Sequence, residues 1–136
     1  MSPAAIVEKA VSQGLGLIAL TDHNSAMNCP AVERICASRS DIRALYGMEV
    51  TSTEEVHLLA LFNTADAALD FGEFIYAHLP DIMNDPEKFG DQVYVDEEEN
   101  ILGEVDKYLG NAVDLSIAAI EAGTHERGGI FIPSHI

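Results

Sequence analysis

The segment Leu17–Asn24 places an acid and an imidazole directly after a run of apolar residues. The run Leu17–Leu20 is followed by Thr21, Asp22 and His23. Apolar runs of this length between turn-forming residues are typical of buried parallel strands. In α/β folds, ligands and catalytic groups gather at the carboxyl ends of such strands. The pattern therefore predicts that Asp22 and His23 lie in a functional site.

The same arrangement recurs in three further segments. Each is mostly apolar and carries a His or Glu at or near one end: Ile42–Met48 with Glu49, Val56–Phe62 with His57, and Gly129–Ser134 with His135. Imidazole and carboxylate groups are the ligands that suit Zn, Mn or Fe. A carboxylate can bridge two ions, and neutral imidazoles hold cations without cancelling their charge. We therefore expect a centre of divalent metal ions.

Length, charge and cysteine spacing narrow the class of protein. The chain has 136 residues, which is enough for one domain with one core. The chain has 23 acidic and 7 basic residues, which gives a net charge of −16. This charge argues against a nucleic-acid partner, because such binding needs Lys and Arg to neutralise phosphates. Cys29 and Cys36 lack a zinc or redox spacing, and no apolar stretch is long enough to span a membrane. We expect a cytoplasmic protein with reduced thiols.

The remaining elements predict an α/β protein with a parallel sheet. Apolar periodicity and capping residues favour helices at 3–13, 30–38, 64–79 and 115–126, and strands at 17–20, 42–48, 56–62 and 130–133. The segment from Asp81 to Asp106 contains ten acidic residues and one lysine. We interpret 81–110 as an acidic, weakly patterned insertion, in which Val93–Val95 could form a short strand.

The two ends of the sequence are unusual for a complete domain. The chain begins in a helix that would normally follow a strand, and it stops at the tip of a strand with His135 and Ile136. We expect 1–136 to be a single partial domain that is truncated at both ends. Such a domain would expose unpaired sheet edges, and these could join two copies into a homo-dimer.

Four of these segments, taken in order, resemble the polymerase and histidinol phosphatase (PHP) domain family of metal-dependent phosphoesterases. They are Gly16–Asn24, Gly47–Thr51, Glu55–Leu59 and Pro133–His135. The resemblance implies a distorted (β/α)7 barrel with mostly parallel strands, of which the first and last are missing from this chain. It also implies a site for two or three ions of Zn, Mn or Fe at the carboxyl ends of the strands.

The resemblance also implies roles for single residues. His23, Glu49, His57 and His135 would be metal ligands, and Glu49 would bridge two ions. Asp22 would be the acid beside the ligands and would act with His23 and Glu49 in catalysis. The family's His-x-His on its first strand and Asp-x-His on its last strand have no counterpart in this sequence.

The function expected on these grounds is hydrolysis of a small phosphorylated metabolite by water activated on two or three metal ions. Two alternatives remain open. The chain could be a non-catalytic, metal-poor fragment of such a domain, which the metal content of the purified protein would reveal. It could instead be a nuclease-type PHP domain, which salt-sensitive activity on single-stranded DNA would reveal.

Overall fold

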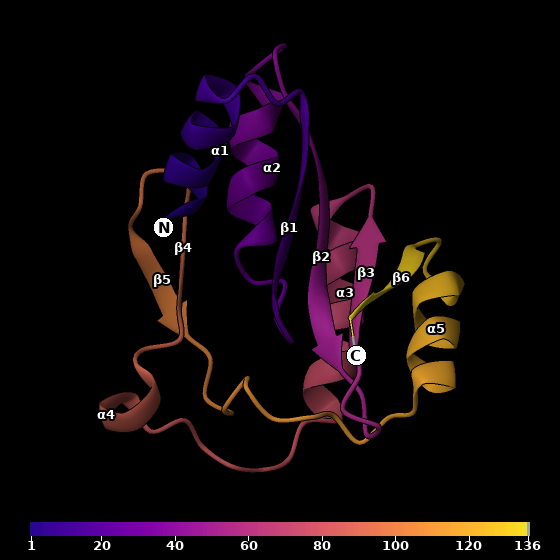
Figure 1. Ribbon diagram of the computed structural model, residues 1–136. Helices are drawn as coiled ribbons and strands as arrows, with labels where there is room; N and C mark the ends of the chain where they lie inside the picture. The colour runs from indigo at the N-terminus through magenta and orange to yellow at the C-terminus, as the bar shows by residue number, and fades with distance from the viewer. Residues whose placement is uncertain (136) are drawn as a thin grey trace.

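A four-stranded sheet with strand order β1-β2-β3-β6 organises the fold, and β4 and β5 form a separate two-stranded sheet (Figure 1). The structure is a computed structural model and describes residues 1–135. The elements are α1 Pro3–Ser12, β1 Leu17–His23, α2 Cys29–Ala37, β2 Arg43–Thr51, β3 His57–Phe62, α3 Ala65–Ala77, α4 Pro86–Phe89, β4 Val93–Val95, β5 Ile101–Glu104, α5 Ile117–Glu126 and β6 Ile130–His135. The helices and strands expected from periodicity are confirmed, including the short strand at Val93–Val95.

The direction of the strands contradicts the expected barrel. β1 and β2 are parallel, but β2 pairs antiparallel with β3, and β3 pairs antiparallel with β6. The prediction of a distorted (β/α)7 barrel with mostly parallel strands and missing first and last strands is therefore wrong. The physical reason is the short link Ser52–Val56 between β2 and β3. A parallel connection needs a crossover of about a dozen residues or more, so a link of this length reverses the chain.

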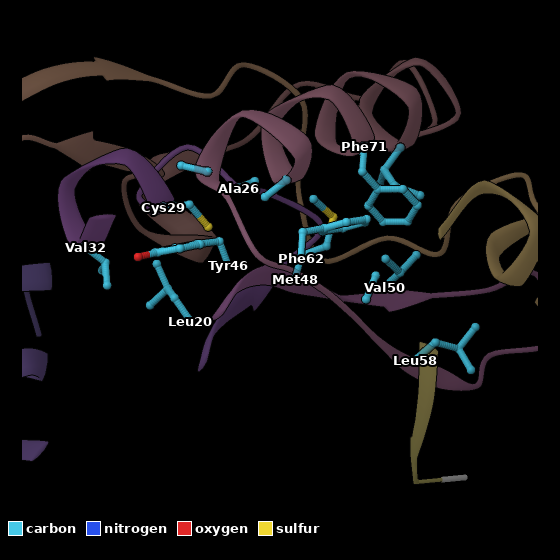
Figure 2. Packing of buried hydrophobic residues seen from close by; sticks show 14 of the residues in the cluster. Leu20, Ala26, Cys29, Val32, Tyr46, Met48, Val50, Leu58, Phe62 and Phe71 are labelled. Carbon is cyan, nitrogen blue, oxygen red and sulfur yellow. The ribbon is translucent and has the colours of Figure 1, made fainter. Parts of the chain in front are cut away.

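One face of the sheet is covered by helices and forms the core. Buried side chains alternate along the strands and point to this face: Tyr46, Met48, Val50, Leu58, Ala60 and Phe62. Helix α3 lies over them, with the rings of Phe62 and Phe71 5.3 Å apart between centroids (Figure 2). The opposite face has little cover, and Leu17 on it is 61% exposed. Glu49 and His57 belong to this open face because side chains alternate in a strand.

The segment 81–110 is tied to the core by polar contacts, although its sequence is weakly patterned. Val95 N donates a hydrogen bond of 3.0 Å to Asn28 Oδ1, just before α2. Arg34 Nε of α2 forms an ion pair of 2.6 Å with Glu97 Oε2. These contacts hold the β4–β5 hairpin beside α2, as Figure 1 shows. In the described part of the chain, no helix has the length and apolar character needed to cross a membrane.

Glu54 links the β2–β3 connection to helix α5, and this contact makes a testable prediction about pH. Ile117 N, in the first turn of α5, donates a hydrogen bond of 3.0 Å to Glu54 Oε2, and this bond lowers the pKa of the Glu54 carboxyl. A lowered pKa means that the ionised carboxylate favours the folded state above the usual Glu range. That contribution is lost as the pH falls through the folded-state pKa.

We therefore expect Glu54→Gln to lower the urea midpoint slightly at neutral pH and to leave it unchanged once the pH is below the folded-state pKa of Glu54. Urea unfolding of both proteins at several pH values measures the difference. Glu55→Gln is the matched control, because its side chain has no hydrogen bond among residues 1–135. An equal difference at all pH values would contradict the prediction.

Candidate metal centre

Strand pairing alone brings three of the expected metal ligands to one edge of the open face. In the parallel pair β1–β2, His23 lies opposite Glu49. In the antiparallel pair β2–β3, Thr51 lies opposite His57. Glu49 and Thr51 are two residues apart on one strand, so their side chains share a face. The side chains of His23, Glu49 and His57 are therefore neighbours.

The distances agree with a group that could hold a metal ion. One nitrogen of His23, one carboxylate oxygen of Glu49 and one nitrogen of His57 all lie within 4.8 Å of one another. Glu49 Oε1 contacts His57 Nδ1 directly. Atoms that bind one zinc ion at about 2.0–2.2 Å lie at most about 4.4 Å apart, so a small side-chain rotation would complete the geometry. The side chains of Glu49 and His57 are half-buried, with 22% and 28% exposed.

A register irregularity in β6 brings His135 to the same cluster. Leu58 pairs with Pro133, yet His57 pairs with His135, so Ser134 is an additional residue in β6. In a regular ladder Ser134 would lie opposite His57, and His135 would point to the other face. The bulge places His135 Nε2 3.7 Å from Glu49 Oε1, and the His135 ring centroid 4.4 Å from that of His57. His135 is the most open member of the cluster, with 62% of its side chain exposed.

Asp22 lies apart from this cluster. It pairs with Met48 in the ladder, so its side chain leaves β1 on the opposite side from His23. Its Oδ2 accepts a hydrogen bond of 3.2 Å from Asn28 Nδ2. Among the described residues, no hydrogen bond joins Asp22 to His23, although both line a hollow of about 180 Å³. The predicted catalytic acid is thus held by the start of α2.

Thr51 is a further polar residue at the cluster. Its hydroxyl Oγ1 lies 3.4 Å from His23 Nε2, and the residue is buried. The direction of this contact depends on the His23 tautomer. The pairing of Thr51 opposite His57 and its proximity to His23 arise from the sheet, and its residue type alone does not indicate them.

Asn24 connects the strands that carry the ligands. It belongs to the sequence segment Gly16–Asn24, but that segment does not indicate what Asn24 does. Its backbone N donates to Glu49 O at 3.0 Å, and its Oδ1 accepts from Thr51 N at 3.4 Å. Its Nδ2 donates to Leu109 O at 2.8 Å and to Asn111 O at 3.0 Å. The residue is 1% exposed and has a φ of 51°, a left-handed conformation that Asn tolerates better than most residues. Asn24 therefore positions the end of β1 against β2.

We expect Asn24→Asp to destabilise the fold and to weaken metal binding together. The new carboxylate oxygen would face two carbonyl oxygens that have lost their donor, at a cost of about 1–3 kcal/mol for each unsatisfied buried group. Urea unfolding measures the stability, and calorimetric zinc titration of the folded variant measures the affinity. Asn63→Asp, at an exposed position before α3, is the matched control. Unchanged zinc affinity in the folded variant would limit Asn24 to a structural role.

Comparison of the chain with protein-family models, with curated proteins and with solved structures found no match. The geometry of the cluster is therefore the observation on which an inference about function depends. Three imidazoles around one carboxylate are a donor set that suits Zn, Mn or Fe. The cluster is open to solvent at His135, where 62% of the side chain is exposed.

Proposed function

We propose that this protein is a metal-dependent phosphoesterase that hydrolyses a small phosphorylated metabolite. One observation carries the proposal: His23, Glu49 and His57 converge on the open face of the sheet, and His135 lies beside them. The order of their motifs resembles that of the PHP family, which also supports it. In this proposal the four residues are the metal ligands, and His23 and Glu49 are the catalytic groups beside the ions. The carboxylate of Asp22, which the sequence predicts to act with them, lies on the other side of β1 and is held there by Asn28.

The bound ions would supply acidified water and a clamp for the phosphate oxygens. Neutral His23 and His57 would hold the cations without cancelling their charge. Glu49 Oε1 contacts His57 Nδ1 and lies 3.7 Å from His135 Nε2, so this carboxylate would hold the ions together with these two imidazoles. A chain with a net charge of −16 repels a phosphate ester, and bound cations would reverse the local sign.

The test is hydrolysis of p-nitrophenyl phosphate by the purified chain. The protein is stripped of metal and then assayed with Zn, Mn or Fe added separately. We expect hydrolysis that requires one of these ions and that His57→Ala removes. His125→Ala is the matched control, because His125 lies on α5 outside the cluster. Tight metal binding without hydrolysis under any of these conditions would contradict the phosphoesterase proposal and favour the non-catalytic alternative.

The nuclease alternative has a weaker basis. The net charge of −16 opposes the phosphate contacts that nucleic-acid binding needs. Activity on single-stranded DNA that falls steeply with salt, in the absence of activity on the small ester, would replace our proposal with this one.

We also propose that the protein works in the cytoplasm. Cys29 and Cys36 are both free and buried, and burial raises the pKa of the Cys29 thiol to about 12. Thiols in this state remain protonated and unreactive, which suits a reducing compartment. Cell fractionation with an antibody against the chain would test the location.

A homo-dimer through the sheet edges is a further proposal. In the described part of the chain, β1 and β6 are the outer strands of the sheet and have no partner on one side. Unpaired edges recruit other strands. Light scattering of the purified chain should give twice the monomer mass, and a monomer at all concentrations would contradict it.

A further inference from the structure

A second hollow, separate from the metal ligands, lies between α3, the loop after β1 and the region around β4 and β5. Its volume is about 530 Å³, and none of the four proposed metal ligands lines it. Small-molecule sites in proteins are typically hollows of roughly 300–1,000 Å³. We call this hollow the α3 cavity. It borders the smaller hollow beside His23 and shares Ser25, Tyr94, Val105 and Leu109 with it.

The walls of the α3 cavity are mainly apolar. Met27 comes from the loop after β1, Leu69 from α3, and Val105 and Leu109 from the segment after β5. Gly72 of α3 also lines the cavity, and because it has no side chain, only backbone atoms of the helix lie at this position. Such walls favour the hydrocarbon body of a ligand, because its burial removes apolar surface from water.

Two tyrosines, Tyr76 of α3 and Tyr94 of β4, add aromatic rings to the lining. The face of a tyrosine ring attracts cations. Tyr76 already makes such a contact in this molecule, because Lys107 Nζ lies 4.9 Å from its ring centroid. The Lys107 ammonium donates hydrogen bonds to Tyr76 O at 3.1 Å and to Leu79 O at 3.3 Å. Lys107 is not among the residues that line the cavity.

The charged groups that line the α3 cavity are all negative. Glu73, Glu104 and Asp106 contribute carboxylates, and no Lys or Arg among residues 1–135 lines it. Within the same residues, none of the three carboxylates accepts a hydrogen bond or forms an ion pair. A phosphate ester would be repelled here, so the ligand differs in charge from the substrate proposed for the metal centre.

We propose that the α3 cavity binds a small organic cation, with an ammonium group on an apolar body. The apolar walls take the body, and the ring of Tyr94 and the three carboxylates take the charge. The proposal does not depend on metal binding or on phosphoesterase activity. Metal-free protein is therefore the right sample, and failure of one proposal leaves the other testable.

The experiment titrates metal-free protein with three probes of similar shape: phenethylamine, phenethyl alcohol and phenylpropionate. Calorimetry or NMR shifts of residues around the cavity measure binding. We expect the amine to bind at least about tenfold more tightly than the alcohol, which corresponds to about 1.4 kcal/mol. We expect the carboxylate probe to bind most weakly. Added salt should reduce the preference for the amine.

Two variants test whether the preference for the amine over the alcohol arises in the α3 cavity. The triple change Glu73→Gln, Glu104→Gln and Asp106→Asn should remove the preference for the amine while leaving alcohol binding unchanged. Tyr94→Leu should weaken the amine more than the alcohol, because the bulk remains and the aromatic face is lost.

The control is a second triple variant with the same change of charge, at Asp66, Glu121 and Glu126, which do not line the cavity. It should bind the amine as the unchanged protein does. Equal affinity for amine and alcohol, no binding of the amine at millimolar concentration, or unchanged selectivity in the first triple variant would each overturn the proposal.

Discussion

Replacing Glu49 by Gln is expected to abolish tight metal binding while leaving the protein folded. Glu49 is the carboxylate in the cluster, and its Oε1 contacts His57 and lies 3.7 Å from His135 Nε2. A neutral amide is a poor ligand for Zn, Mn or Fe, and the substitution removes the one negative charge that offsets the ions. Loss of an outer partner of a metal ligand costs about 10–100-fold in affinity, so loss of a ligand should cost more.

Calorimetric titration with zinc and elemental analysis of the purified variant measure this effect. Glu49 is partly exposed, and Gln has nearly the same shape, so the urea midpoint of metal-free protein should change little. Glu55→Gln, at an exposed position in the link between β2 and β3, is the control with the same chemical change. If the Glu49 variant keeps the metal stoichiometry and affinity of the unchanged protein, the cluster is not the metal centre.

Gly47→Ala is expected to be among the most damaging single substitutions in the sheet. A Cβ at this position would lie 1.8 Å from Ala60 O and 2.8 Å from Ala60 C, both of which belong to the backbone of β3. No side-chain rotation relieves such contacts, so β3 would have to move away from β2. Overpacking of a well-packed interior typically costs about 1–3 kcal/mol, and a backbone clash this close should reach or exceed the upper value.

The effect should extend to the metal centre, because Gly47 precedes Glu49 by two residues and Ala60 follows His57 by three. Urea unfolding and zinc titration of the same variant measure both consequences. Gly72→Ala provides a control of opposite sign. Its Cβ would meet Met48 Cε at 3.5 Å, an ordinary contact, and Ala is preferred to Gly in a helix by about 1 kcal/mol. Similar midpoints for Gly47→Ala and the unchanged protein would show that β3 can shift at no cost.

Much of the local structure could be predicted from the order of residues. The apolar runs before Asp22 and Glu49 indicate strands because apolar side chains predominate there and Arg43 is the one charged residue within them. Ser2 followed by Pro3 indicates the start of α1, and Ser2 Oγ does accept a hydrogen bond of 3.2 Å from Ala5 N. These signals can be recognised in the sequence because each depends only on residues that are close together in the chain.

The antiparallel direction of β3 is set by the short connection that precedes it, and the residues of β3 itself do not indicate it. The apolar pattern of Val56–Phe62 is the same for a parallel or an antiparallel strand, so periodicity cannot distinguish them. The short link Ser52–Val56 is the feature of the sequence that indicates an antiparallel pair. As a result His57 reaches the cluster from the start of its strand, whereas His23 and Glu49 reach it from the ends of theirs.

By itself, the sequence determined which residues could bind a metal ion and which segments are strands, since both follow from residue type and local spacing. Tertiary structure alone decided how those residues meet. The bulge at Ser134 turns His135 toward Glu49, Asn24 joins β1 to β2 and to Leu109, and the α3 cavity forms where 81–110 packs beside α3. Each of these features depends on pairing between residues far apart in the chain, which no local pattern encodes.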